Sequence, residues 1–205
     1  GAPPIISAAV MARYRAIAMD KSSFPWYNIL PNTYESTEAD MSISLLPKLI
    51  ARELPQLTPE LLHRLGVRLL MLDFDNTIVP YTTDIPTEEM RWWLESMKQS
   101  DIQLCVVSNS KRERVKVFCA AYGLDCITHA TKPFPKGIRH CLQKYGVPAG
   151  EAALAGDQIY TDTLGANCLG VTSILVSAIN NHNFWLKARH VLELPFIAMA
   201  RGRRI

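Results

Sequence analysis

The chain has 205 residues, which is enough for one domain with a buried core and short for two. Its composition is 48% hydrophobic and 20% charged, which excludes intrinsic disorder and collagen-like sequence. The net charge of +3 is too small to indicate nucleic-acid binding. The five cysteines form no C-x-x-C pair and are odd in number, so we expect neither a paired zinc site nor a disulfide framework.

The two ends of the chain differ from its middle. Residues 1–40 contain several prolines and a polar run, which predicts an irregular N-terminal arm. A single domain is predicted over 41–205, with a basic C-terminal tail over 182–205 that also contains aromatic residues. Such a tail is compatible with contact with an anionic membrane surface, but a helix packed on the domain explains the same pattern, and we favour the helix.

No apolar run reaches the ~20 residues that a membrane-spanning helix needs, so no transmembrane span is predicted. We expect a cytoplasmic protein, or one that lies peripherally at the inner face of a membrane. The sequence does not indicate the oligomeric state.

From residue 58 onward the sequence alternates between helical and strand patterns. A threonine followed by proline predicts a short helix over 58–66, and the apolar run 67–73 predicts a strand buried on both faces. The later predicted elements are, in chain order, a helix from 87, a strand over 102–107, a helix over 110–123, a strand near 126–129, a helix over 136–145, a strand over 152–155, a helix over 161–168 and a strand over 171–176. This order predicts an α/β fold, a three-layer Rossmannoid parallel sheet flanked by helices, without a separate cap domain.

Chemically reactive side chains follow four of the predicted strands. The first strand ends in Asp73 and Asp75, the second is followed by Ser108, the third by Lys132, and the fourth by Asp157, with Asp162 a little further on. Because the carboxyl ends of parallel strands meet at one edge of a sheet, we expect these side chains to lie close together.

Paired acids at one strand end suit phosphoryl transfer through an aspartyl-phosphate. Asp73 is the candidate nucleophile, because a carboxylate can attack phosphorus. Asp75 lies two positions on, where strand geometry places it on the same side, so it is the candidate acid and base. A phosphate dianion beside Asp73 and Asp157 requires a cation, and carboxylate oxygens suit Mg²⁺. Lys132 and the Ser108 hydroxyl would hold the remaining phosphate oxygens.

Each of these residues also has a purely structural interpretation. Asp73 and Asp75 are common residues of turns at strand ends, and Ser108 is a common turn or cap residue. A lone lysine such as Lys132 is usually solvated, and Asp162 can be an acid in the first turn of a helix rather than a metal ligand. The coincidence of all of them at matching strand ends favours the chemical interpretation.

Four short motifs resemble those of the haloacid-dehalogenase superfamily of phosphatases. These motifs are DFDNT, SNS, Lys132-Pro133 and GDQIYTD. The longer strings DFDNTIVPY, KPFPKG and GDQIYTDTLGAN are similar to the class IIIA branch, which contains phosphatidylglycerophosphatases. The resemblance covers about 58–176 and says little about the two ends of the chain.

The resemblance assigns roles to particular residues. It implies that Asp73 is the nucleophile, Asp75 the acid and base, and that Ser108 and Lys132 bind phosphate. It further implies that Mg²⁺ is held by Asp73, by the Asp75 backbone carbonyl and by Asp157. Three more polar residues are expected to support the site from beside it, namely Thr77, Asn109 and Asp162.

The spacing of the motifs leaves no room for a cap domain, so an open site is expected, with room for a large substrate. The sequence thus predicts a Mg²⁺-dependent phosphatase, and the resemblance implies phosphatidylglycerophosphate as substrate and a role in phospholipid metabolism. One alternative is a phosphatase of a soluble phosphate ester or nucleotide. The other is a non-enzymatic module with the same fold that binds a protein or ribonucleoprotein. The expected partner is a phosphate ester, and nucleic acid is not expected. Contact between the tail and an anionic membrane stays open as the alternative to a packed helix.

Overall fold

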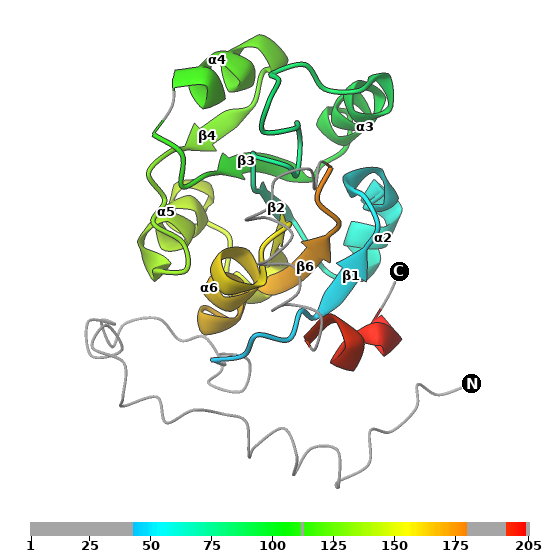
Figure 1. The fold of residues 1–205 in the computed structure, drawn as a ribbon, viewed down its shortest axis with the longest axis vertical. Coiled ribbons are helices and arrows are strands. Elements are labelled where there is room, and N and C mark those ends of the chain that lie inside the picture. The colour runs from blue at the N-terminus through cyan, green and yellow to red at the C-terminus, as the bar shows by residue number, and fades with distance from the viewer. Residues whose placement is uncertain (1–42, 112, 180–195, 204–205) are drawn as a thin grey trace, which may run out of the picture.

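A computed structural model describes residues 43–111, 113–179 and 196–203. A six-stranded sheet lies at its centre, in the order β1-β6-β5-β2-β3-β4, and every strand pairs in parallel with its neighbours. The strands are β1 (Leu49–Ala51), β2 (Leu69–Leu72), β3 (Gln103–Val107), β4 (Asp125–Ile127), β5 (Ala152–Gly156) and β6 (Thr172–Val176). Figure 1 shows helices on both sides of this sheet.

The helices connect successive strands. They are α2 (Pro59–Arg64), α3 (Glu88–Lys98), α4 (Glu113–Tyr122), α5 (Pro135–Tyr145) and α6 (Leu164–Cys168). Short turns of other helical types are η3 (Leu54–Gln56), η4 (Ala149–Glu151), the π-helical turn η5 (Ile159–Thr163) and η6 (Arg201–Arg203).

The central strand β2 is buried on both faces, which explains its uninterrupted apolar sequence. Leu70 and Leu72 belong to a cluster with buried residues of α2, α3 and α4. Leu69 and Met71 belong to a second cluster with residues of α5 and α6. Two separate clusters, one for each face of the sheet, confirm the predicted three-layer α/β fold.

The predicted helix starts and stops depend on local hydrogen bonds. The Thr58 and Thr87 hydroxyls accept hydrogen bonds from the backbone N–H groups of Leu61 and Met90, which caps α2 and α3 at their first turns. At the end of α5, Gly146 adopts a left-handed conformation with φ of 63°, which a side chain would disfavour. These caps orient the helices against the sheet and so set the loops at its edge.

Two elements differ from the sequence expectation. The strand β1 was not predicted, and it extends the sheet by pairing with β6 at residues more than a hundred positions away. The predicted helix over 161–168 is shorter, because the chain first makes the turn η5, in which the Thr163 N–H bonds to the Gln158 carbonyl five residues earlier. This wider turn carries Asp162 into a buried position.

Within the described ranges, no helix has both the length and the apolar character needed to cross a bilayer. The predicted N-terminal arm and most of the basic tail lie outside these ranges.

Candidate active site

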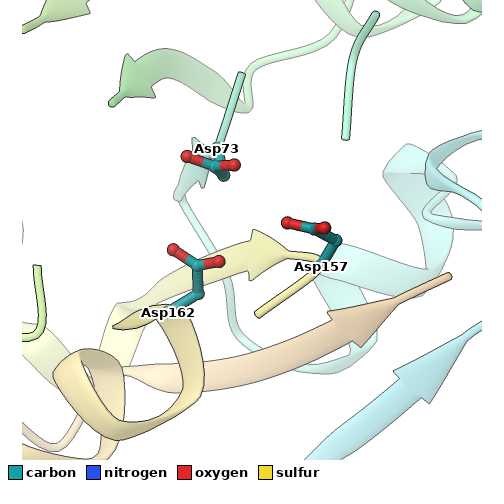
Figure 2. A group of neighbouring side chains, drawn as sticks. All are labelled: Asp73, Asp157 and Asp162. Carbon is teal, nitrogen blue, oxygen red and sulfur yellow. The ribbon is translucent and has the colours of Figure 1, made fainter. Parts of the chain in front are cut away.

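Three carboxylates meet at the carboxyl edge of the central strands. Asp73 directly follows β2, and its N–H donates a hydrogen bond of 2.9 Å to the Ala155 carbonyl of the neighbouring strand β5. Asp157 directly follows β5, and Asp162 reaches the same place from η5. All three are buried, and each offers an oxygen atom within 4.8 Å of the others. Figure 2 shows their carboxylates turned toward a shared space.

Lys132 pairs with two of these carboxylates. Its Nζ lies 2.7 Å from Asp73 Oδ1 and 2.7 Å from Asp162 Oδ1, and the side chain is almost fully buried. Burial alone would lower the pKa of Lys132, but the charges of Asp162 and Asp73 outweigh it and raise this pKa above its usual value. The lysine is therefore a permanent cation between two acids.

Asp162 titrates closer to neutrality than an ordinary aspartate. Burial raises the pKa of Asp162 to about 6, while the charge of Lys132 opposes that rise. The second oxygen, Oδ2, accepts a hydrogen bond of 3.1 Å from the Gln158 N–H. A Cβ atom at Gly156 would overlap the Asp162 carboxylate, so the absence of a side chain there allows the close approach.

The backbone of Lys132 is held by a single side chain. Asn109 Oδ1 accepts a hydrogen bond of 2.6 Å from the Lys132 N–H, and Asn109 Nδ2 donates one of 2.8 Å to the Lys132 carbonyl. The chain approaches Lys132 through His129 and Thr131, both at positive φ values of 55° and 58°. These conformations are uncommon for residues with side chains, so tertiary contacts must maintain the loop.

Ser108 is buried at the carboxyl end of β3, beside β2 in the sheet. Its backbone bonds on one side to the Ile127 carbonyl and on the other to the Ala130 N–H, and its hydroxyl accepts a hydrogen bond of 3.1 Å from the Ser110 N–H. Ser108 thus links β3 to the loop that presents Lys132.

Asp75 lies in a turn just beyond β2. It forms a β-bridge with Val79, and Asn76 between them has a φ of 60°. The Asp75 Oδ1 atom lies 3.5 Å from Arg114 Nη2. Thr77 is buried in the same turn, and its hydroxyl has no hydrogen-bond partner among the described residues.

The structure therefore divides the predicted residues into three groups. Asp73, Lys132, Asp157 and Asp162 form one buried cluster, Ser108 and Asn109 hold the neighbouring loop, and Asp75 and Thr77 lie in the turn after β2.

Sequence reasoning missed Arg114 and Gly156. A charged residue on a predicted amphipathic helix is normally assigned to the solvated face, so Arg114 gave no usable signal. Gly156 is the last residue of a strand made mostly of small residues. A glycine at a strand end can indicate that another group approaches the backbone closely, and this was the available signal.

The cluster fits a hard divalent cation. Three buried carboxylates lie with oxygen atoms within 4.8 Å of one another, and two of them share the ammonium group of Lys132. Carboxylates this close repel one another in a place with little water, and a cation between them offsets that repulsion. Carboxylate oxygens are the ligands that Mg²⁺ prefers, and Asp73, Asp157 and Asp162 would hold it here. This set includes Asp162, whereas the resemblance implies the Asp75 backbone carbonyl.

Comparisons with known proteins identify relatives of this chain. A family model described as haloacid dehalogenase-like hydrolase matches residues 43–170. The probable phosphatase YqeG of Bacillus subtilis (strain 168) is 33% identical over 131 residues, which is 64% of this chain and 76% of that relative.

Solved structures with a similar fold include two phosphatases. The cobalt-bound deoxy-D-mannose-octulosonate 8-phosphate phosphatase of Haemophilus influenzae aligns with a TM-score of 0.45 and 14% identity, over 62% of this chain and 88% of that one. The 3-deoxy-D-manno-octulosonate 8-phosphate phosphatase of Yersinia pestis aligns with a TM-score of 0.45 and 14% identity, over 70% of this chain and 88% of that one. These likenesses are too distant to indicate a substrate.

The family model covers more than half of the chain, and the relative in Bacillus subtilis shares a third of its residues over the matched region. The chain therefore belongs to the haloacid dehalogenase-like hydrolase family, and the prediction of an enzyme, a phosphatase of this family, is confirmed.

Proposed function

We propose that this phosphatase is a Mg²⁺-dependent phosphomonoesterase that acts through an aspartyl-phosphate on Asp73 and dephosphorylates phosphatidylglycerophosphate. The observation that carries the chemistry is the position of Asp73 at the end of β2, buried, with one oxygen 2.7 Å from Lys132 Nζ. The ion pair with Lys132 holds the buried carboxylate in a fixed direction, which a nucleophile needs.

In the first step, an Asp73 oxygen forms a bond to phosphorus while the bond from phosphorus to the substrate alcohol breaks. Asp75 donates its proton to the departing oxygen, so a neutral alcohol leaves. In the proposal, Lys132 and the Ser108 hydroxyl bind the remaining phosphate oxygens. When bound, Mg²⁺ supplies positive charge that offsets the repulsion between the phosphate and the carboxylates.

In the second step, water attacks the phosphorus of the aspartyl-phosphate. Asp75, now ionised, takes a proton from that water, and the bond between phosphorus and Asp73 breaks. Inorganic phosphate leaves, and both aspartates return to their starting protonation states. The proposal thus uses each of the two acids in a separate role.

The short intervals between the motifs support a large substrate. Between Asp75 and Ser108 the structure contains one loop, α3 and β3, and between Ser108 and Lys132 it contains α4 and β4. Neither interval holds an additional domain that would cover the edge of the sheet. Among the described residues, no inserted domain stands between the motifs, which is what a bulky phosphate ester requires.

Three partly exposed apolar side chains on the loops beside the site support a substrate with an apolar part. Tyr81, Phe134 and Ile179 are 42%, 49% and 42% exposed, and they follow β2, β4 and β6 respectively. Asn76 connects two of these loops, because its Oδ1 accepts from the Tyr81 N–H at 3.0 Å and its carbonyl from the Ile179 N–H at 2.9 Å. Loops at such an edge are usually polar, and a lipid explains apolar residues there.

Membrane contact is part of the same proposal. The tail over 182–205 is basic and aromatic, and each base near an anionic surface contributes about 1 kcal/mol to binding. Co-sedimentation with vesicles of phosphatidylglycerol, compared with vesicles of phosphatidylcholine, tests this contact directly.

The deciding experiment measures Mg²⁺-dependent phosphate release from phosphatidylglycerophosphate in mixed micelles, with Asp73→Asn beside the wild type. We expect release that disappears in the variant and in EDTA. Glycerol 3-phosphate, which has the same kind of phosphate ester and no acyl chains, is the matched soluble substrate. Efficient turnover of the soluble ester without release from the lipid would refute the lipid substrate and leave the chemistry in place.

A further inference from the structure

Arg114, in the first turn of α4, contacts the loop of residues 80–84, which follows the turn that contains Asp75. Its Nε lies 2.7 Å from Asp84 Oδ1, and Nη1 donates a hydrogen bond of 2.7 Å to the Tyr81 carbonyl. Nη2 donates one of 3.0 Å to the Thr83 carbonyl and a longer one of 3.4 Å to Pro80. The side chain is 14% exposed, so most of its surface is covered by these groups.

The same guanidinium group also contacts the residues next to the proposed nucleophile. Its central carbon lies 5.2 Å from the centre of the Phe74 ring and 5.9 Å from that of Tyr81, which are cation–π distances. Phe74 stands between the two aspartates of the first motif. Nη2 also lies 3.5 Å from Asp75 Oδ1.

The planar guanidinium group of Arg114 thus donates hydrogen bonds to carbonyls of the loop, lies over aromatic rings and faces two acids. The contact with Asp75 is longer than the contact with Asp84, so the arginine is anchored mainly on the loop. The loop and the turn of Asp75 are thereby fixed relative to α4.

We infer that Arg114 is a positioning residue that holds the carboxyl group of Asp75 where it can protonate the departing oxygen. This inference rests on the proposed function, because it assumes that Asp75 is the acid. An arginine with a merely structural role would change stability or overall activity. A positioning role instead predicts a decrease in kcat/KM that is larger for substrates whose leaving group needs a proton more.

The test compares two substrates of nearly the same shape. Phenyl phosphate releases a weakly acidic phenol, which needs protonation as it departs, whereas 4-nitrophenyl phosphate releases a more acidic one that needs it less. The ratio of kcat/KM for the two esters reports the step in which the bond to the leaving group breaks. For Arg114→Gln, we expect the ratio of 4-nitrophenyl to phenyl phosphate to rise about tenfold over the wild type. Asp75→Asn should raise the same ratio at least as much.

Two further variants make the result decisive. Arg68→Gln removes an arginine that pairs with Glu151 at 2.7 Å at the opposite end of β2, and we expect its ratio to match the wild type. Asp84→Ala removes an exposed anchor of Arg114 and should raise the ratio by a smaller factor, which decides the question if Arg114→Gln does not fold.

The outcomes separate the inference from the proposed function. A wild type that releases phosphate neither from these esters nor from phosphatidylglycerophosphate would overturn the proposed activity and the inference with it. An active wild type whose ratio stays constant in Arg114→Gln, or in Asp84→Ala if the first variant does not fold, would overturn the inference alone. Equal losses on both esters would have the same meaning, because they indicate a general structural role.

Discussion

Asn109→Ala is the change that most directly tests how the site holds Lys132. The asparagine side chain bonds to both the N–H and the carbonyl of Lys132, at 2.6 Å and 2.8 Å, and so fixes the peptide groups on both sides of that residue. Alanine removes both contacts and leaves the loop with its two positive φ values less well supported.

The size of the effect follows from these two hydrogen bonds. Each contributes about 0.5–1.5 kcal/mol to stability, so we expect a loss of about 2 kcal/mol. For a protein of this length, this corresponds to a decrease in Tm of about 4–8 °C. Displacement of Lys132 Nζ from the phosphate site weakens a charged contact, for which a decrease in kcat of about 100-fold is typical.

A double-mutant cycle identifies the route of the effect. If Asn109 acts through Lys132, Asn109→Ala should reduce kcat/KM in the wild-type background and have little further effect in a Lys132→Ala background. Asn109→Asp keeps an acceptor for the Lys132 N–H and loses the donor to the carbonyl, so it should destabilise the protein as well. Additive losses in the cycle, or an alanine variant with unchanged kcat/KM and Tm, would refute this account of the loop.

Three other predictions concern the carboxylates. Asp157→Asn should raise the Mg²⁺ concentration for half-maximal activity at least about tenfold. The control variant Asp125→Asn removes an exposed acid that pairs with Lys144 and should leave this concentration unchanged. Equal Mg²⁺ requirements in the two variants would contradict the ligand assignment. Because the pKa of Asp162 is raised from 3.8 to about 6, the folded protein binds this proton more tightly than the unfolded chain, and its contribution to stability is present at low pH and lost as pH rises. Thermal melts in EDTA should therefore show the wild type losing stability relative to Asp162→Asn between about pH 4 and 6, and parallel curves would be inconsistent with this burial. Gly156→Ala should displace the Asp162 carboxylate and reduce kcat/KM. Gly150→Ala, whose Cβ would meet no atom within 4 Å, should keep the kcat/KM of the wild type. An unchanged kcat/KM in Gly156→Ala would show that catalysis does not depend on the position of Asp162.

Much of the fold was predictable because strands buried on both faces have a distinctive sequence. The apolar run that contains β2 and the small-residue run of β5 could be recognised locally, and their adjacent ends place Asp73 beside Asp157. The edge strand β1 has three residues and no alternation, and its pairing depends on β6 and on a hydrogen bond of 2.9 Å from the Lys48 N–H to Ser173 Oγ. A contact over such a distance along the chain leaves no periodic signal.

The site was predictable to the extent that it depends on strand ends. The alternation argument for Asp75 stops at Leu72, where β2 ends, and the chain then forms a turn bridged to Val79. The position of Asp162 depends on the π-helical turn and on the small Gly156, and neither can be derived from a helical pattern. The sequence left Asp162 open between a helix-capping acid and a metal ligand, and the structure places it against Lys132.

The balance of charge in the cluster bears on the choice between an enzyme and a binding module with the same fold. Burying a carboxylate is costly unless a cation compensates it, and here Asp73 and Asp162 share the ammonium group of Lys132. Substituting a neutral residue for one of these acids would reduce the repulsion between the carboxylates. In a protein that only binds a partner through its surface, such a substitution would not impair the function. A chain that keeps three buried acids within 4.8 Å of one another therefore bears a repulsion that a catalytic cation site explains and a surface-binding role does not.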